Sequence, residues 1–453
     1  MASSSDAMRE TVTLGLIFLL IFSAYYMIQG YASLLFGEAL ASDALVALYA
    51  TFTVGCLFAS AVVAKCGARA TLMAGVAGYA AFSLAALAYA AYGGAPWARA
   101  LVVAGGAANG CGAALLWTAQ GALVLANARD DAKRAVGAHF GVFWALFNAS
   151  AVLGGVVTFA YFSSAPESAA SNAPLYVIFT ALIGAGGLAT LRLRPGRPRP
   201  SARSDDDNDD DDDDDDAPGG ELRATLRAAL DRRAALLLPL FWYTGFNQPY
   251  QLNGFADRFF RERVLGLELA AFYSAEVLGA FVAARVLDGP GTAASAWDKR
   301  RAARRLLTGF FAATTVGYGV AGSLEYDHRR RAVEPVGGAK VALPTLAFVA
   351  WGLSDALVQT YAIWVIDALF AGARQRTRLV ALYKLVQSAG PPPRWCAGYA
   401  ILPQARCPAL VQLVATGACY IVGTAFALCQ LPEGPANHVA LLGEADYADR
   451  QSV

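Results

Sequence analysis

The run VTLGLIFLLIFSAYYMIQGYASLLF, residues 12–36, contains no charged side chain. At 1.5 Å per residue, a helix of this length is long enough to cross the roughly 30 Å of hydrocarbon in a bilayer. The run is longer than the core of a signal peptide and has no small-residue cleavage site after it. We therefore expect residues 12–36 to be a retained membrane span.

Comparable apolar runs recur along the chain and indicate its class. Apolar residues make up 57% of the 453 residues and charged residues only 16%, against about 25% charged in soluble domains. Backbone groups in lipid need partners within their own segment, so each run is predicted to be a helix. The predicted spans are 12–36, 43–64, 70–92, 99–126, 136–162, 173–191, 234–253, 265–286, 306–324, 342–369, 378–402 and 409–431. The expected fold is therefore an all-α integral membrane protein with about 12 transmembrane helices in two six-helix halves.

Charges in the loops predict the topology. Loops after even-numbered spans carry Lys65 and Arg69, then Arg129, and further basic residues at 299–305 and 374–378. Because basic loops stay on the cytoplasmic side, both termini, residues 1–11 and 432–453, are predicted to be cytoplasmic. The N-terminal bundle is then 12–191 and the C-terminal bundle 234–431. Between them, the linker at 192–233 contains aspartate runs at 205–207 and 209–216, and we expect it to be a disordered cytoplasmic spacer.

The two halves also resemble each other weakly. Phe22 and Gln29 in the first span have the same separation as Phe241 and Gln248 in the seventh. An aromatic residue followed by an amide four residues later occurs in the fifth span (Trp144, Asn148) and in the eleventh (Tyr383, Gln387). Repeats of this kind are typical of secondary transporters.

Polar side chains inside the predicted spans are the candidate functional residues, because such groups are costly in lipid. Helical spacing places them on shared faces of several spans. The candidates for a substrate pathway are Gln29, Asn109, Trp117, Gln120, Trp144, Asn148, Asn247, Gln248, Gln251, Asp355, Gln359 and Gln387. Buried amides also join helices without binding anything, so a solvated cavity and structural hydrogen bonding remain alternatives.

Asp355 and Lys384 are the candidate intramembrane charge pair. They lie at similar depths in the tenth and eleventh spans, and pairing would lower the cost of burial. In the alternative, Lys384 extends to the membrane interface. Glu276 in the eighth span is a weaker candidate for the same cavity.

Other chemistry has no support in the sequence. The seven cysteines are scattered without a CxxC pair, and no phosphate-binding loop, nucleophile elbow or zinc helix occurs. We expect no enzyme activity, no cofactor, no metal site and no nucleic-acid partner. The expected partners are the lipid bilayer, an unknown small solute or ion, and a further membrane protein such as a channel or receptor in the alternative function.

Several segments resemble the UNC-93-like branch of the major facilitator superfamily. They are ALYATFTVGCLFASAVVAKCGARATLMAGVAGYA (47–80), LLWTAQG (115–121), FGVFWALFN (140–148), LPLFWYTGFNQPY (238–250), WGLSDALVQT (351–360) and ALYKLVQSAG (381–390). Together they cover both halves, leaving out the aspartate-rich linker and the tail.

The resemblance implies two functions that remain alternatives. One is a solute or ion-linked transporter with a polar central cavity. The other is a non-transporting regulatory or trafficking partner, since animal members include an accessory subunit of a potassium channel and an escort of Toll-like receptors, and plant members are linked to potassium homeostasis. The chain departs from the general facilitator pattern at Ala64, where an acidic residue is usual before Lys65, Gly67 and Arg69. It also carries Pro391, Pro392 and Pro393 within the predicted eleventh span, where a helix should break.

Overall fold

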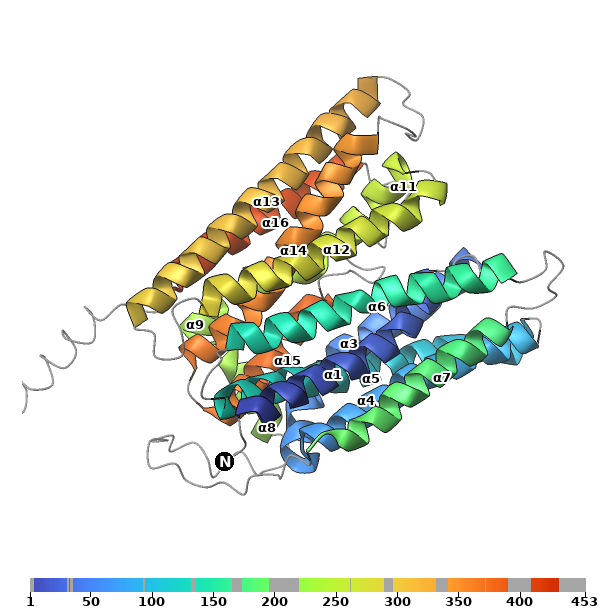
Figure 1. Cartoon of the computed structure of the whole chain (residues 1–453), viewed down its shortest axis with the longest axis horizontal. Coiled ribbons are helices and arrows are strands. Elements are labelled where there is room, and N and C mark those ends of the chain that lie inside the picture. The colour runs from blue at the N-terminus through green and yellow to red at the C-terminus, as the bar shows by residue number, and fades with distance from the viewer. Residues whose placement is uncertain are drawn as a thin grey trace, which may run out of the picture.

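The computed structural model is nearly all helical. It describes residues 4–30, 32, 36–92, 94–131, 136–164, 173–194, 220–260, 262–288, 296–330, 341–370, 372–389 and 409–431. The aspartate runs, Pro391–Pro393 and the C-terminal tail lie outside the described residues. Figure 1 shows the helices gathered into two groups that lie side by side. The expected all-α fold in two six-helix halves is confirmed by this arrangement and by the structural comparisons given below.

The N-terminal half contains six long helices. They are α1 (Ser4–Gly30), α3 (Glu38–Cys66), α4 (Ala68–Ala91), α5 (Pro96–Asp130), α6 (Val136–Ser164) and α7 (Ala173–Ala189), followed by a 3-10 turn, η1 (Thr190–Arg192). Helix α1 begins at Ser4, several residues before the predicted span at 12–36. Between α3 and α4 the chain turns at Gly67, whose φ of 81° is disfavoured for other residues.

The helices of the C-terminal half are less regular. Its long helices are α12 (Glu262–Asp288), α13 (Ala296–Arg330), α14 (Ala342–Leu369), α15 (Ala373–Ala389) and α16 (Ala409–Cys429). The seventh predicted span, 234–253, is formed by α10 (Leu238–Gln248), the π-helix η2 (Pro249–Phe255) and the short α11 (Ala256–Phe259). Pro249 lacks an amide hydrogen for the regular helical ladder, which explains why the α-helix ends at Gln248.

Nine helices in the described part of the chain are long and apolar enough to cross a membrane. They correspond to the predicted spans one to six, eight, ten and twelve. Of the other three predicted spans, the seventh is interrupted by η2, the ninth lies within the more polar α13, and the eleventh is described only as far as Ala389. Large apolar side chains face outward on both halves, among them Val54 in α3, Leu278 in α12 and Val414 in α16, all more than half exposed. Such surfaces are what contact with lipid requires.

The predicted disordered linker at 192–233 is wrong in its last part. Residues 220–228 form α8 (Gly220–Ala228), and α9 (Arg232–Ala235) follows it. Helix α8 packs against α3 of one half and α15 of the other, and the hydroxyls of Ser60 and Thr225 are 3.1 Å apart. Asp231 caps α9 by accepting a hydrogen bond from the Arg233 amide at 2.8 Å. The Arg233 side chain holds the pKa of Asp231 below its ordinary value. The aspartate runs end at residue 216, and the prediction of disorder was wrongly extended from them to residue 233.

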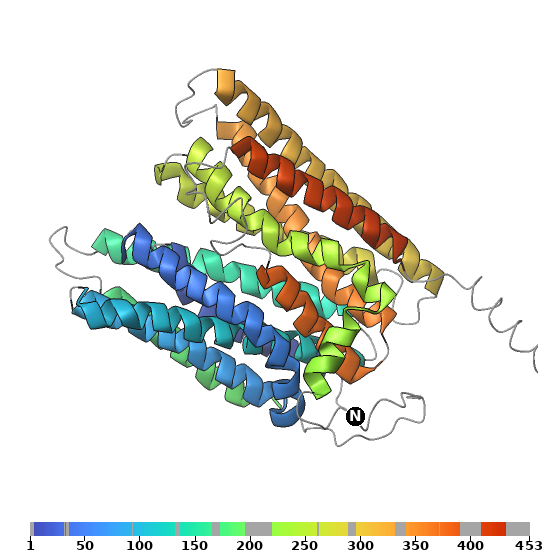
Figure 2. The same cartoon turned by 180° about the vertical axis from the view of Figure 1, so that it is seen from behind.

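The halves meet mainly along two pairs of helices, and α5 also packs against α15. Helix α6 packs against α12, and α3 packs against α15. In the view from behind (Figure 2), α16 in red lies alongside α13, away from this interface. The interface is close where α6 begins: a Cβ at Gly141 would contact Ala280 and Ala284 of α12, and the Gly137 amide donates to the Asp288 carboxylate at 3.1 Å. This end of the bundle also holds the N-terminus, α8 and α9 (Figure 1), and we call it the α8 end.

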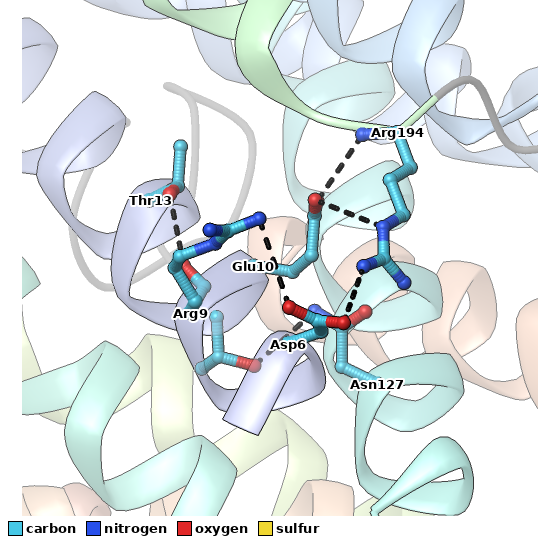
Figure 3. Close-up of polar contacts among 7 residues, drawn as sticks. Asp6, Arg9, Glu10, Thr13, Asn127 and Arg194 are labelled. Carbon is cyan, nitrogen blue, oxygen red and sulfur yellow. Dashed lines mark hydrogen bonds and ion pairs between the residues drawn. The ribbon is translucent and has the colours of Figure 1, made fainter. Parts of the chain in front are cut away.

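Ion pairs hold α1 to the end of α7 at the α8 end. Figure 3 shows Arg194 reaching Asp6 and Glu10 of α1. The Arg194 guanidinium is 3.2 Å from Asp6 and 3.7 Å from Glu10, and its backbone amide donates to Glu10 at 3.2 Å. These groups are partly exposed, so the pairs orient the helix ends more than they stabilise the fold.

Candidate functional site

Most of the predicted pathway residues lie inside the protein. Seven polar side chains from four membrane helices and η2 are almost fully buried, and we call them the polar seam: Asn109, Gln120, Asn148, Asn247, Gln251, Asp355 and Gln359. Trp144 is also buried, whereas Trp117, Gln387, Gln29 and Gln248 keep partial exposure. Gln29 lies beside Tyr49. The pathway itself stays a prediction, but burial of the seam is observed.

Asp355 is held by residues of two neighbouring helices. The Asn247 amide nitrogen in α10 donates to one Asp355 oxygen at 3.2 Å. Glu276 in α12 interacts with Asp355 from the other side. Both carboxyl groups are at most 2% exposed. Two acidic side chains therefore face one another within the C-terminal half.

Lys384 does not form the predicted ion pair with Asp355. Its ammonium donates to the Gln387 side-chain oxygen at 2.7 Å. It also lies 4.5 Å from the ring centre of Trp117 and 4.6 Å from that of Tyr383, within the range of cation–π attraction. Nor does the lysine extend to the membrane interface, because it is only 4% exposed. The predicted pair rested on depth along the two helices, and the direction of the side chains could not be predicted from spacing alone.

Gln387 joins Lys384 to a hydrogen-bonded group in the C-terminal half. Its amide nitrogen lies 3.1 Å from both the Thr244 hydroxyl and the Gln359 oxygen. Tyr383 donates its hydroxyl hydrogen to the same Gln359 oxygen. The close approach of α10 to α15 depends on Gly245, because a Cβ there would collide with the Gln387 carbonyl. Sequence reasoning missed Thr244, although its position three residues before Asn247 puts both on one helix face.

The N-terminal half presents aromatic rings at the corresponding place. Trp117 lies 5.2 Å from Phe18, 5.4 Å from Phe22 and 5.1 Å from Phe147, measured between ring centres. Trp144 stacks on Phe140 at 5.6 Å. Trp117 therefore stands between this aromatic cluster and the Lys384 ammonium, which makes it a contact between the two halves.

Amides of the seam in both halves lack hydrogen bonds. Neither polar atom of the Asn148 side chain has a partner in the described structure. Asn109 lies near Tyr25, and Gln251 lies near Tyr318, yet no amide atom of Asn109 or Gln251 reaches hydrogen-bonding geometry. An amide buried without a partner costs about 1–3 kcal/mol. These residues are therefore poorly explained as bonds that join helices.

Charged residues connect the halves at the α8 end. Arg129 of α5 is 3.3 Å from Asp367 of α14, and Arg376 of α15 is 3.5 Å from the same carboxylate. Within the N-terminal half, the His139 ring in α6 is 3.2 Å from Asp131 and 2.7 Å from the Thr11 hydroxyl. Across the described residues, no group of three or more His, Cys, Asp or Glu side chains is arranged to hold a metal ion.

Comparison with known proteins agrees with the sequence motifs. The family described as "Ion channel regulatory protein UNC-93" matches residues 42–256. UNC93-like protein 1 of Arabidopsis thaliana is 28% identical over 78% of this chain and 75% of its own length. UNC93-like protein C922.05c of Schizosaccharomyces pombe is 27% identical over 77% of this chain and 68% of its own length. The chain is therefore similar to UNC-93-like proteins over more than three quarters of its length.

Solved structures place this chain in the major facilitator fold. The Escherichia coli fucose:proton symporter FucP superposes with a TM-score of 0.65 at 14% identity, covering 95% of this chain and 99% of the symporter. The proton:xylose symporter XylE gives 0.67 at 12% identity, covering 95% and 96%. At these identities the likeness shows the fold alone.

Proposed function

We propose that this UNC-93-like chain is a solute or ion-linked transporter, and that its pathway runs along the polar seam between the two halves. The alternating-access motion would rock one half against the other about the α6–α12 and α3–α15 contacts. Both termini would lie on the cytoplasmic side, which makes the α8 end the cytoplasmic end.

The observation that carries this proposal is the lack of partners for seam amides. If the amides only joined helices, their donors and acceptors would be bonded across the helix interfaces. Instead, both side-chain polar atoms of Asn148 and Gln251 and the amide nitrogen of Gln120 are unpaired while buried. Retaining such groups at a cost of about 1–3 kcal/mol each is understandable if they hydrogen-bond a solute or water during transport.

A second candidate is a non-transporting partner of an ion channel or membrane receptor. It is favoured by the family description, which names an ion channel regulator. In that case the sensitive residues would be on the outward faces or loops. The two candidates therefore predict opposite positions for disruptive substitutions.

The test is a ligand screen on the purified full-length protein. Ions and small metabolites are added one at a time, the thermal unfolding midpoint is recorded, and copurifying proteins are identified. The transporter proposal expects at least one solute to raise the midpoint, and expects Asn148→Ala and Gln120→Ala to lose that response. The outward-facing variants Leu278→Ala and Val414→Ala serve as controls and should keep it. A stoichiometric protein partner, no stabilising solute and sensitivity only at the outward positions would overturn the proposal.

A further inference from the structure

Glu276 and Asp355 form a buried acidic pair that the hydrogen bonds and ion pairs of the surrounding helices do not neutralise. Glu276 is 2% exposed and Asp355 is 1% exposed, and the two carboxyl groups interact across the α12–α14 contact. The cation that interacts with Asp355 is Lys384, which donates a hydrogen bond to Gln387 and lies over aromatic rings. Like charges brought together without water cannot both remain ionised.

Unpaired oxygen atoms of Asp355 and Asn247 indicate which ligand the acidic pair binds. Asn247 uses its amide nitrogen on one oxygen of Asp355, so that oxygen is a hydrogen-bond acceptor. The other Asp355 oxygen and the Asn247 carbonyl oxygen, both in residues only 1% exposed, have no hydrogen-bond partner in the described structure. A surplus of buried acceptors calls for a donor hydrogen or a cation.

Charge balance favours a single proton. Two carboxylates and one ammonium sum to −1, and one added proton brings Glu276, Asp355 and Lys384 to zero. A neutral total is the state that burial in a low dielectric favours. A metal ion is less suited, because only two carboxylates converge here and the described residues contain no group of three metal-ligating side chains.

From these observations we infer that Glu276 and Asp355 share one proton and form a proton-binding site within the C-terminal half. Its role as the coupling-ion site rests on the proposed transport function, whereas the proton binding itself does not.

Other ionisable groups around the pair are few. Those that interact with either carboxyl are Tyr26 of α1, Tyr243 of α10, Tyr273 of α12, and Tyr383 and Lys384 of α15. Helix α13 adds Tyr318 in the next layer, where it interacts with Tyr243. Helix α6 crosses α12 near Gly141 and has no ionisable residue from 142 to 155. Tyrosines stay neutral near pH 7, so the acidic pair and Lys384 determine the titration.

Infrared spectroscopy of the purified full-length protein tests the shared proton directly. Wild type should show the carbonyl stretch of a protonated carboxylic acid near neutral pH, shifted in D2O and lost on raising the pH. Glu276→Gln and Asp355→Asn should each abolish the band, because either variant leaves one carboxylate balanced by Lys384. Asp231→Asn, at the partly exposed cap of α9, is the control and should leave the band unchanged. Loss of the band in only one of the two variants would contradict sharing, and absence from wild type would contradict the site.

A second measurement covers variants that fail to fold. The thermal unfolding midpoint of wild type is recorded at fixed pH with sodium, potassium or a bulky organic cation as the chloride salt. A proton site predicts the same midpoint in all three salts and a midpoint that changes with pH. Stabilisation by sodium or potassium, together with a missing carboxylic-acid band, would assign the pair to a metal cation. Neither measurement uses a transported solute, so the proton site can fail while the transport proposal stands, and the reverse.

Discussion

The two halves of the molecule face their common interface with different chemistry. On the C-terminal side, Asp355, Glu276, Lys384 and Gln387 form a charged group in which most members interact with one another. On the N-terminal side, Trp117 stands in a cluster of phenylalanine rings, and amides such as Asn148 are unpaired. Around Lys384 the interface therefore combines ionisable side chains from the C-terminal half with an aromatic cluster from the N-terminal half.

The largest effect is expected from removing the one cation of the charged group. Lys384→Met would leave the Gln387 oxygen unpaired and the two carboxyl groups without a balancing charge, at a cost of about 3 kcal/mol. The unfolding midpoint in detergent measures the loss. Lys65→Met is the matched control, since Lys65 is exposed at the end of α3. Equal midpoints for Lys384→Met and wild type would show that the charged group contributes little to stability.

Two glycine-to-alanine substitutions, one in each half, compare how tightly the helices pack around them. Gly245→Ala should destabilise by about 1–3 kcal/mol, because its new methyl group would collide with the Gln387 carbonyl. Gly155→Ala in α6 has no heavy atom within 4 Å of the added carbon and should be neutral or slightly stabilising, by about 0.5–1 kcal/mol. Thermal unfolding of the two variants gives the comparison. If both variants have the same unfolding midpoint, the close approach of α10 to α15 does not stabilise the protein.

Apolar replacements of similar size should act in opposite directions in the two halves. Asn148→Leu removes an unpaired buried amide, so we expect stability to be unchanged or raised by about 1 kcal/mol. Gln387→Met removes a group that bonds Lys384, Thr244 and Gln359, and should lower stability by about 1–2 kcal/mol. Unfolding midpoints and the response to a stabilising solute are measured together. A destabilised Asn148→Leu variant would indicate that Asn148 has a structural partner after all.

The smallest effect is expected at the end of the linker. Asp231→Ala removes the cap of α9 and should weaken that helix by about 0.5–1 kcal/mol, seen as faster hydrogen exchange at residues 232–237. Since the pKa of Asp231 is lowered below its ordinary 3.8, the contribution is present above that pH. It is lost only as the pH falls through the lowered value. Exchange that is unchanged in Asp231→Ala would show that Arg233, which also donates to the Leu369 carbonyl at 2.9 Å, holds α9 without the cap.

Helix positions could be predicted from the sequence because the cost of polar backbone in lipid leaves few alternatives. The tenth span, predicted at 342–369, has those bounds in the structure. Two predictions made from composition failed. The seventh span is interrupted at Pro249, and α8 forms shortly after the aspartate-rich stretch that was predicted to be disordered.

Side-chain partners were less predictable than helix positions. The sequence indicated that Asp355 and Lys384 share a depth, but helix rotation and rotamers direct Lys384 towards Gln387 and Trp117. Glu276 was singled out only weakly, because a lone acidic residue in a span gives no sign of the helix it faces. Whether the seam conducts a solute stays a proposal that no sequence pattern decides.

Accessibility of the seam tests the central claim most directly. Single cysteines are introduced at Asn148, Gln251 and, as an outward-facing control, Leu278, after replacement of the seven native cysteines. Each is then exposed to a membrane-impermeant thiol reagent from either side of the membrane. The pathway account predicts that positions 148 and 251 react while position 278 does not. No reaction at 148 and 251 from either side would mean that the polar seam is dry packing, and would contradict a pathway between the halves.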